Sequence, residues 1–439
     1  MSLRHTVQEV TLETGSKGLL IDVPDATVFS YTLVFNAGDE MVIDKRKTQI
    51  AHLTEHMLCN EPRDYENADV FSRDFTKNSA YSNALTNAAQ IEHYGDCPDL
   101  EWERIFTLQL RQIVEPKFTE EALRNEQETA LEELGQYVDD DWVRMNHLAW
   151  RSVGSKTPSI EEEIASIPQI TLDDVVKHYE RTYTHPNLRF VIVGKLTEER
   201  KTTIIHLLES WPLPDGGVYM KPPLHTYKPA TDAVIVARDH ETTVCPVVRF
   251  VIPRVISHEE HMHLIALRHL LMDTDHSIIY GRLRKEGICY SASMEYGVNR
   301  DGVSTLSFWT NTSPDHIAAY TTILSQELQR VANGSLQAAD VAAAQQYAVA
   351  AEQRNRLTVE DIIASYSAEY LYDESIWSDK YRHELIRRLN PVVMKRLMRE
   401  FLSAEVWMYG EQGNTDGASA LKRRSVYEKM NQEIRSQSS

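Results

Sequence analysis

Hydrophobic residues recur along the chain with two spacings, one typical of strands and the other of helices. Runs of β-branched and aromatic residues predict strands at 27–35, near 90–94 and at 188–194. The same pattern predicts strands at 247–252 and 406–410 in the second half. Both halves therefore contain segments that suit the pleated, half-buried surface of a sheet.

Apolar residues three and four positions apart predict helices between these strands. The predicted helices span 48–59, 172–179, 259–272, 336–354 and 391–402, and another begins after Thr119. Glu120 and Glu121 follow Thr119 directly, and the helix dipole favours acidic residues in this first turn. The polar, basic residues at the C-terminus predict a final helix or a frayed tail.

A proline-rich segment lies between the two groups of elements. Residues 211–217 and then Pro222, Pro223 and Pro229 interrupt any helix or central strand. Because similar elements follow in a similar order on both sides, the chain is predicted to be a duplicated α+β protein. The predicted domains are 1–210 and 230–439, joined by a linker at 211–229.

Composition and charge limit the class of protein. The chain has 439 residues, of which 42% are hydrophobic and 25% charged, and this suits a globular protein with more than one domain. A net charge of −19 argues against binding to nucleic acid or to an anionic membrane surface. No apolar run is long enough to span a bilayer, and no secretory or transit segment is recognisable. A cytoplasmic protein is therefore expected.

Two further patterns predict ordinary structure. The four cysteines form no CxxC pair, which predicts buried, reduced thiols and no thiolate metal site. The histidine-rich segment 258–263 lacks a matching acidic helix, so it predicts a solvated helix start and no second metal site.

The predicted helix at 48–59 carries a sequence with its own chemistry, His52-Leu53-Thr54-Glu55-His56. Histidines four residues apart project from one helical face and can bind one metal ion, and Glu55 lies on the same side. This H-x-x-E-H order is the inverted motif of zinc peptidases. A carboxylate beside a zinc-bound water can take its proton and pass it to the leaving amine. The alternative is an exposed helix with unrelated His and Glu residues.

A third metal ligand is expected, and the long helix after Thr119 offers candidates. Glu126 and Glu133 are two turns apart and therefore lie on one helical face. Glu128 and Glu132 are also present, so the charge pattern taken alone favours a solvated acidic face.

With these motifs, the sequence resembles the family of pitrilysin, insulin-degrading enzyme and mitochondrial processing peptidase. In that family the third zinc ligand follows the second motif histidine by about 75 residues and has a glutamate two turns before it. Glu133 and Glu126 stand at these positions. The resemblance implies that His52, His56 and Glu133 hold one Zn²⁺ per chain, that Glu55 is the general base, and that Glu126 orients the site. Glu132 is the competing ligand.

Two other segments resemble substrate-binding parts of the family. Asn83 and Ala84 begin a segment similar to the family's Asn-Ala-x-Thr edge strand, which implies that they bind the substrate backbone. Taken alone, Asn83 would be a turn or strand-end residue. Arg284 and Tyr290 lie in a segment similar to one that contacts the peptide and the developing oxyanion. They are one residue closer together than in the family pattern, so Arg282 is the alternative to Arg284.

The second half keeps the predicted elements and lacks the predicted ligands. Aligning the two long helices places Ala344 and Ala351 opposite Glu126 and Glu133, and the segment opposite the metal motif has leucines at the ligand positions. One active and one inactive domain are therefore expected.

The resemblance implies two homologous α+β domains, each a mainly antiparallel sheet with helices packed on it, forming half of a clamshell. Short members of the family pair with a second chain, so a homodimer or a heterodimer is expected. The predicted function is that of a zinc-dependent endopeptidase that cleaves short or unfolded polypeptides through a zinc-bound water. Its net charge suggests basic peptides. The alternatives are a non-catalytic scaffold or partner subunit, and a metal hydrolase with other substrates.

Overall fold

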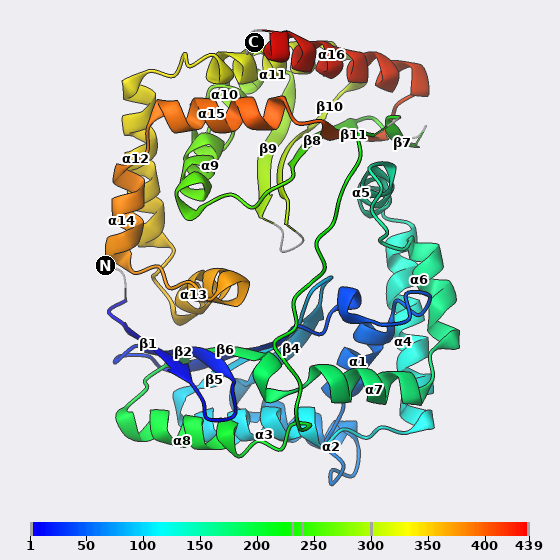
Figure 1. The fold of residues 1–439 in the computed structure, drawn as a ribbon, viewed down its shortest axis with the longest axis vertical. Helices are drawn as coiled ribbons and strands as arrows, with labels where there is room; N and C mark the ends of the chain where they lie inside the picture. The colour runs from blue at the N-terminus through cyan, green and yellow to red at the C-terminus, as the bar shows by residue number, and fades with distance from the viewer. Residues whose placement is uncertain (1–2, 231, 239–240, 299–301, 437–439) are drawn as a thin grey trace. The chain divides into compact units, whose positions relative to one another are not determined.

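The computed structural model describes residues 3–230, 232–238, 241–298 and 302–436. The chain forms two compact units, each assembled from separate segments of the sequence. The first unit contains Met1–Gly135, Glu161–Pro223 and Glu352–Trp377, and the second contains Gln136–Ile160, Leu224–Ala351 and Ser378–Ser439. Each unit has its own sheet and its own helices, which confirms the predicted α+β class (Figure 1).

The first unit is built on a six-stranded sheet in the order β1-β2-β6-β3-β5-β4, in the part of the chain described. Its strands are β1 (Thr6–Thr11), β2 (Lys17–Asp22), β3 (Val28–Phe35), β4 (Tyr81–Thr86), β5 (Ile91–Pro98) and β6 (Leu188–Gly194). Neighbouring strands are antiparallel except for the parallel pair β2 and β6. The order leaves β4 at one edge of the sheet.

Alternate residues of the central strands enter two apolar layers, one on each face of this sheet. Phe29, Tyr31 and Leu33 of β3 join a large layer of helices, whereas Val34 faces the opposite side. The helices of the large layer are α1 (Ile50–Cys59), α2 (Ala68–Thr76), α3 (Trp102–Val114), α4 (Glu120–Val138), α6 (Ile160–Ser166), α7 (Leu172–Thr182) and α8 (Glu198–Glu209). This alternation fixes which residues of each strand can reach the α1 side.

The opposite face is covered by α13 (Val359–Asp373), a helix from the second half of the sequence. Its Ile362, Tyr366 and Tyr370 are buried against apolar residues of β2, β3 and β6. Beyond its C-terminus, Glu374 accepts hydrogen bonds from Lys17 at 2.9 Å and from Arg189 at 2.8 Å. Apolar packing and this ion pair both attach α13 to the first sheet.

The second unit is built on a five-stranded sheet in the order β7-β11-β8-β10-β9, within the described ranges. Its strands are β7 (Val234–Ala237), β8 (Val244–Ile252), β9 (Cys289–Val298), β10 (Ser304–Thr312) and β11 (Val406–Gly413). Only the short β7 runs parallel to its neighbour among these described strands. Both sheets are therefore mainly antiparallel, as predicted.

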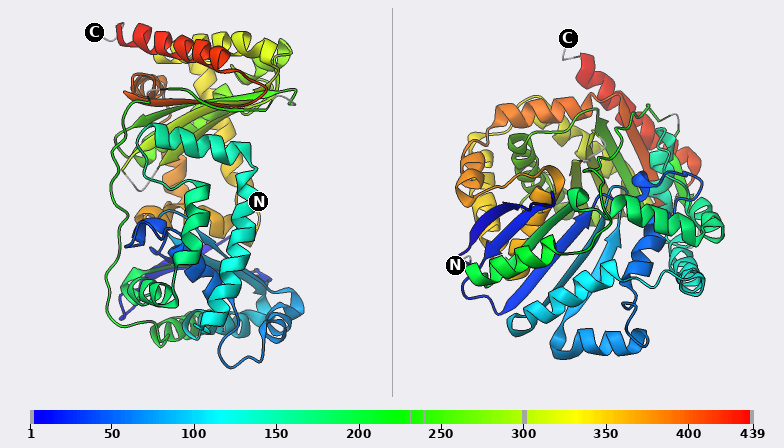
Figure 2. Two further views of the ribbon diagram at one scale, coloured as in Figure 1. Left: turned by 90° about the vertical axis from the view of Figure 1, so that its right-hand side faces the viewer. Right: turned by 60° about the horizontal axis from the view of Figure 1, so that its bottom comes forward.

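Helices cover both faces of the second sheet as well (Figure 2). One face carries α5 (Asp141–Ser152), whose Met145 and Ala149 are buried against β8 and β11. The remaining helices of this unit are α9 (His258–Leu271), α10 (Tyr280–Lys285), α11 (Ile317–Ala332), α12 (Ala338–Arg354), α14 (Asp379–Arg387), α15 (Pro391–Leu402) and α16 (Gly417–Ser436). The C-terminal residues thus form the helix that was one of the two predicted outcomes.

The two units exchange one helix each. The chain passes from one unit to the other within α4 and again within α12, and the helix that follows each, α5 or α13, packs on the sheet formed mainly by the other half. The third passage, at Pro223, lies inside the predicted linker. The domain boundaries inferred from the repeat concern homologous segments and stay a prediction.

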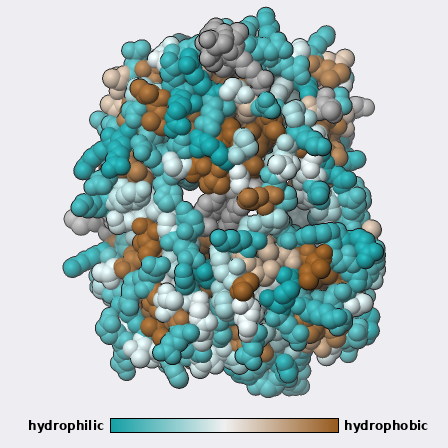
Figure 3. All heavy atoms as spheres, in the orientation of Figure 1, coloured by the Kyte–Doolittle hydropathy of each residue, from teal (hydrophilic) through white to brown (hydrophobic). Residues whose placement is uncertain are grey.

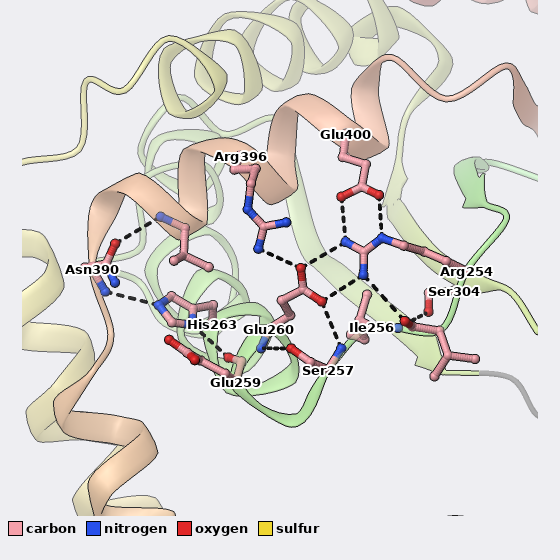
Figure 4. Close-up of polar contacts among 12 residues, drawn as sticks. Arg254, Ile256, Ser257, Glu259, Glu260, His263, Ser304, Asn390, Arg396 and Glu400 are labelled. Carbon is pink, nitrogen blue, oxygen red and sulfur yellow. Dashed lines mark hydrogen bonds and ion pairs between the residues drawn. The ribbon is translucent and has the colours of Figure 1, made fainter.

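The start of α9 explains the histidine-rich segment 258–263 (Figure 4). Ser257 and Glu260 form a capping box, and the Glu260 carboxylate accepts hydrogen bonds from Arg254 and Arg396. His263 is fully buried, and its ring accepts a hydrogen bond from the backbone N–H of Asn390. The predicted helix start is present, but the prediction that it is solvated was wrong, because it is tied to the turn before α15.

Surface features add two observations. The described cysteines are all free, and three are buried, whereas Cys59 is exposed against expectation. On the face drawn in Figure 3, hydrophobic residues occur in separate small groups among hydrophilic ones. No helix among the described residues is long and apolar enough to cross a bilayer.

Candidate metal centre

Helix α1 places the H-x-x-E-H residues through its apolar face. Ile50, Leu53 and Met57 are buried in the helical layer of the first unit, which fixes the rotation of the helix. His52 and His56 are separated by one turn and lie at the border of this buried face, with side chains 15% and 14% exposed. The two rings meet edge to face, with centroids 4.5 Å apart.

Helix α4 presents its glutamates to these histidines. Leu123, Ala130 and Leu134 are its buried residues, so Glu126 and Glu133 lie beside the face that contacts the protein. Glu133 Oε2 lies 3.6 Å from His52 Nε2 and 3.5 Å from His56 Nε2. Its competitor Glu132 is exposed. Within the described residues, the one group of side chains that can hold a metal ion is His52, His56 and Glu133.

The hydrogen bonds of the two imidazoles leave their Nε2 atoms without protons. His52 Nδ1 lies 2.8 Å from the side-chain oxygen of Gln49, and His56 Nδ1 lies 3.0 Å from Glu126 Oε2. Both partners are acceptors, so each Nδ1 carries the proton and each Nε2 presents a lone pair. These two Nε2 atoms are only 3.0 Å apart. Two lone pairs and a carboxylate oxygen at such distances require a cation between them.

The spacing of the three atoms suits zinc. Tetrahedral zinc with bonds of about 2.0–2.1 Å has ligand atoms about 3.4 Å apart. The three separations here are 3.0, 3.5 and 3.6 Å. Two imidazoles and one carboxylate also form a ligand set of catalytic zinc sites, in which a fourth position stays open for water.

Glu126 acts on His56 from outside the ligand set. Its second oxygen accepts a hydrogen bond of 2.9 Å from the amide of Asn60, the residue that ends α1. Burial raises the pKa of Glu126, but the hydrogen bonds from His56 and Asn60 outweigh it, and the pKa is lowered. Glu126 therefore stays ionised and fixes the ring and the tautomer of His56.

The two histidines differ in their ionisation. Burial lowers the pKa of His52, and the neighbouring His56 lowers it further, to about 4. Burial also opposes the charged form of His56, but the hydrogen bond to Glu126 and the nearby carboxylates raise its pKa above the usual value. His52 is thus held neutral, as a metal ligand must be.

Glu55 is buried, with 8% of its surface exposed, and one side chain orients it. Thr86, the last residue of β4, donates a hydrogen bond of 2.6 Å to Glu55 Oε2. Burial raises the pKa of Glu55, and the Thr86 hydrogen bond opposes this rise. A carboxylate that is oriented and has a raised pKa is a better proton acceptor than an exposed one.

The edge strand β4 connects this centre to a row of exposed residues. Its Tyr81 and Leu85 are 50% and 52% exposed, and Asn83 between them is exposed as well. Ala84 is buried, and its N–H donates to the side chain of Asn83 at 2.9 Å. An uncovered edge strand with large apolar side chains is a template for pairing with another extended chain.

Arg284 and Tyr290 lie together in the second unit. The Arg284 guanidinium stacks over the Tyr290 ring at 5.0 Å, and Tyr290 is 81% exposed. Arg282 is instead hydrogen-bonded to Glu286 and Gln326. Of the two arginines, Arg284 is therefore the one that accompanies Tyr290. Their approach to a peptide in the first unit stays a prediction.

Sequence reasoning missed three side chains that hold the centre in place. Thr86, Gln49 and Asn60 bind Glu55, His52 and Glu126, respectively. Gln49 precedes His52 by three residues and Asn60 follows His56 by four, so helical spacing could have identified both. Thr86 lies in the strand motif that begins at Asn83, but only a fold can bring its hydroxyl to Glu55.

The corresponding helices of the second unit contain packing residues. Val341 and Ala348 of α12 are buried like Leu123 and Ala130 of α4, which supports the alignment of these helices. Opposite Glu126 stands Ala344, which is fully buried. In α9, buried leucines occupy the positions that correspond to the metal motif; they are Leu267, Leu270 and Leu271.

Comparisons with known proteins agree with this architecture. Residues 169–347 match the family model described as the peptidase M16 inactive domain. The matches support the M16 peptidase family. No curated protein matches the sequence significantly. The matched segment begins after the metal centre, so it contains the ligand-free helices and neither α1 nor α4.

Several solved M16-type structures share the fold. A peptidase M16 inactive domain from Pseudomonas fluorescens has a TM-score of 0.80 at 14% identity, covering 94% of this chain and 99% of that chain. A protease from Helicobacter pylori has a TM-score of 0.78 at 17% identity, with 93% and 99% covered. An M16-like peptidase from Alicyclobacillus acidocaldarius has a TM-score of 0.81 at 15% identity, with 94% and 100% covered. Two-domain M16 structures are therefore matched over nearly their whole length.

Proposed function

We propose that this protein is a zinc-dependent endopeptidase that cleaves extended polypeptides. The observation that carries the proposal is the convergence of two unprotonated Nε2 atoms and a Glu133 oxygen within 3.0–3.6 Å. Such an arrangement is electrostatically unfavourable without a cation. Packing offers no reason for it, and the second unit has leucines at the same helix positions.

Zinc bound by His52, His56 and Glu133 would supply a Lewis acid that lowers the pKa of a coordinated water. Glu55 is the residue placed to accept a proton from water and to donate it to the departing amine. Thr86 holds Glu55 in one orientation through its hydrogen bond of 2.6 Å. Glu126 holds His56 in the tautomer that binds metal.

The edge strand supports a polypeptide as the substrate. Thr86, which contacts Glu55, and the exposed Asn83 lie on the same strand, β4. A peptide that pairs with β4 through backbone hydrogen bonds would pass the centre in an extended conformation. Asn83 and Ala84 would then contact the substrate backbone. Pairing of this kind selects extended chains and excludes folded ones.

The decisive experiment combines metal analysis with turnover. Purified protein loaded with zinc should cleave an internally quenched unstructured peptide, lose this activity on chelation and regain it when zinc is restored. Glu55→Gln should bind the same amount of zinc and lose at least about a hundredfold in kcat. Full activity after verified removal of the metal would refute the proposal, and so would normal turnover by Glu55→Gln.

A non-catalytic partner subunit is the second candidate. It is favoured by the family match, which is to the inactive domain and covers 169–347. This candidate predicts that the zinc-loaded chain cleaves no peptide alone but increases the activity of a related chain. Assays with and without such a partner distinguish the two. Pairing with a second chain and the source of its natural peptides remain proposals of the same kind.

A further inference from the structure

The sheet of the first unit carries a pocket on the face opposite α1. Its volume is 560 Å³, within the range of about 300–1,000 Å³ typical of ligand pockets. The pocket is bordered by β3, β5, the beginning of β4 and the first turn of α13. All these segments belong to the first unit, which also contains the candidate metal centre.

Three carboxylates line the pocket, and none of its lining residues is a lysine, arginine or histidine. They are Asp25 before β3, Asp96 of β5 and Glu360 of α13. None of the three has an ion-pair partner in the described part of the chain. Burial raises the pKa of Asp96, and the charge of Glu360 raises it further, as expected for acids that face each other without a cation.

Two buried hydroxyls provide an independent indication of a polar ligand. Ser30 and Thr32 line the pocket and are only 6% and 8% exposed. Ser30 is paired with Asp96 and Thr32 with Tyr94, so their side chains share the pocket face of the sheet. Neither hydroxyl has a hydrogen-bond partner among the described residues. A buried hydroxyl without a partner is costly, and a ligand that donates hydrogen bonds would satisfy both.

Two aromatic rings complete the wall beside β4. Tyr81 of β4 and Tyr94 of β5 line the pocket, with ring centroids 6.4 Å apart and planes inclined at 53°. Tyrosine faces attract cations, and they stack on guanidinium groups in particular. The three carboxylates are not a group close enough to hold a metal ion, in the described part of the chain. An extended organic cation therefore fits better than a bare ion.

The pocket and the candidate centre are served by the same strand. Tyr81 begins β4 at the pocket, and Thr86 ends it at Glu55. Five residues of extended chain span about 17 Å, and a peptide paired with β4 advances by the same amount per residue. A substrate residue at the pocket would therefore lie about four to six positions from the bond at the metal centre.

We propose that this pocket binds a lysine or arginine side chain of the polypeptide substrate, at that distance from the cleaved bond. The proposal rests on the proposed function, because it assumes a peptide paired along β4. It locates at one pocket a preference for basic peptides that net charge alone left unplaced.

The test uses the full-length zinc-loaded protein and quenched peptides that carry one lysine, moved one position at a time along a Gly-Ser-Gln background. A lysine about five positions from the cleaved bond should raise kcat/KM about tenfold over glutamine, mainly through KM. Norleucine at that position should not reproduce the gain. In Asp96→Asn with Glu360→Gln, the Lys-to-Gln ratio should fall to about one.

Glu103→Gln is the matched control, because Glu103 is an exposed acid on α3, in the helical layer on the opposite face. Its Lys-to-Gln ratio should equal that of the wild type. Equal rates at all lysine positions, or a preference that persists in the double variant, would overturn the pocket. Anisotropy of the same peptides bound to Glu55→Gln decides the question without turnover. Selective binding with no cleavage by the wild type would refute the peptidase and retain the pocket.

Discussion

Glu126 is a residue whose value depends on two partners, His56 on one oxygen and Asn60 on the other. Replacing its carboxylate by an amide keeps the size of the side chain but removes the charge that holds His56 in place. We expect Glu126→Gln to weaken zinc binding about 10–100-fold. Competition with a fluorescent zinc chelator measures this directly.

Glu128→Gln serves as the control for this prediction, since Glu128 is an exposed acid on the same helix. It changes the net charge of α4 by the same amount without touching a histidine. Equal zinc affinity of the two variants would mean that Glu126 contributes only to the general field of α4.

Thr86 permits a second prediction at this scale. Thr86→Val removes the hydroxyl that donates to Glu55 and keeps the shape of the side chain, so kcat should fall about tenfold while zinc content stays unchanged. Thr86→Ser restores the donor and should restore most of the rate. If serine and valine behaved alike in the peptide assay, the hydrogen bond would not orient the base.

The individual ligands could be predicted from the sequence, and their supporting residues could not. His52, His56 and Glu133 are related by helical spacing and by a family pattern, both of which survive in a linear sequence. The contact between Thr86 and Glu55 joins a strand to a helix, and no periodicity encodes such a contact. The pocket around Asp96 was missed for the same reason, because its acids come from a loop, a strand and a distant helix.

Among the elements, α9 depends on its first turn. Glu260 is 6% exposed, and burial is outweighed by hydrogen bonds from Arg254, Ser257 and Arg396, so that its pKa is lowered to about 2. A lowered folded-state pKa contributes stability above the ordinary pKa of the carboxyl group, and this contribution is lost as the pH falls towards 2.

Glu260→Gln should therefore lower the free energy of unfolding by about 2 kcal/mol at pH 7, after allowance for solvent screening. Urea titrations at several pH values should show this difference in full above pH 4.5 and a shrinking difference below it. Glu259→Gln, one residue earlier on α9, is the control. A difference that grew on acidification would contradict the assignment.

The helix α13 makes a prediction about fragments. A fragment of residues 1–223 leaves exposed the sheet face on which Ile362, Tyr366 and Tyr370 are buried. Each such side chain contributes about 1.5–3 kcal/mol on burial, so this fragment should not unfold cooperatively. The same fragment with residues 352–377 joined by a flexible linker should do so, as calorimetry can establish. Cooperative unfolding of the shorter fragment would show that α13 is dispensable.

The types of most central elements were predictable, because their apolar periodicity is strong. The strand Leu188–Gly194 and the helix Pro391–Leu402 have the predicted bounds, whereas β8 begins three residues earlier than predicted and β5 extends beyond Tyr94. Amphipathic periodicity identifies a helix but not the sheet it will cover. The exchange of α5 and α13 therefore had no signal in the sequence.

For the molecule as a whole, duplication predicts a single metal ion. The second unit has buried leucines and alanines where the first has ligands, so purified protein should contain one zinc per chain by elemental analysis. Either His52→Ala or His56→Ala should remove it. Two zinc ions per chain after dialysis would mean that another site exists.

The helix exchange also orders events during synthesis. The first sheet lacks the cover of one face until residue 377 has emerged from the ribosome, although its own strands are complete by residue 194. Its apolar face must therefore wait, exposed, while most of the second half is translated. A nascent chain of this kind is a natural client for a ribosome-associated chaperone, and early release should direct it to aggregation.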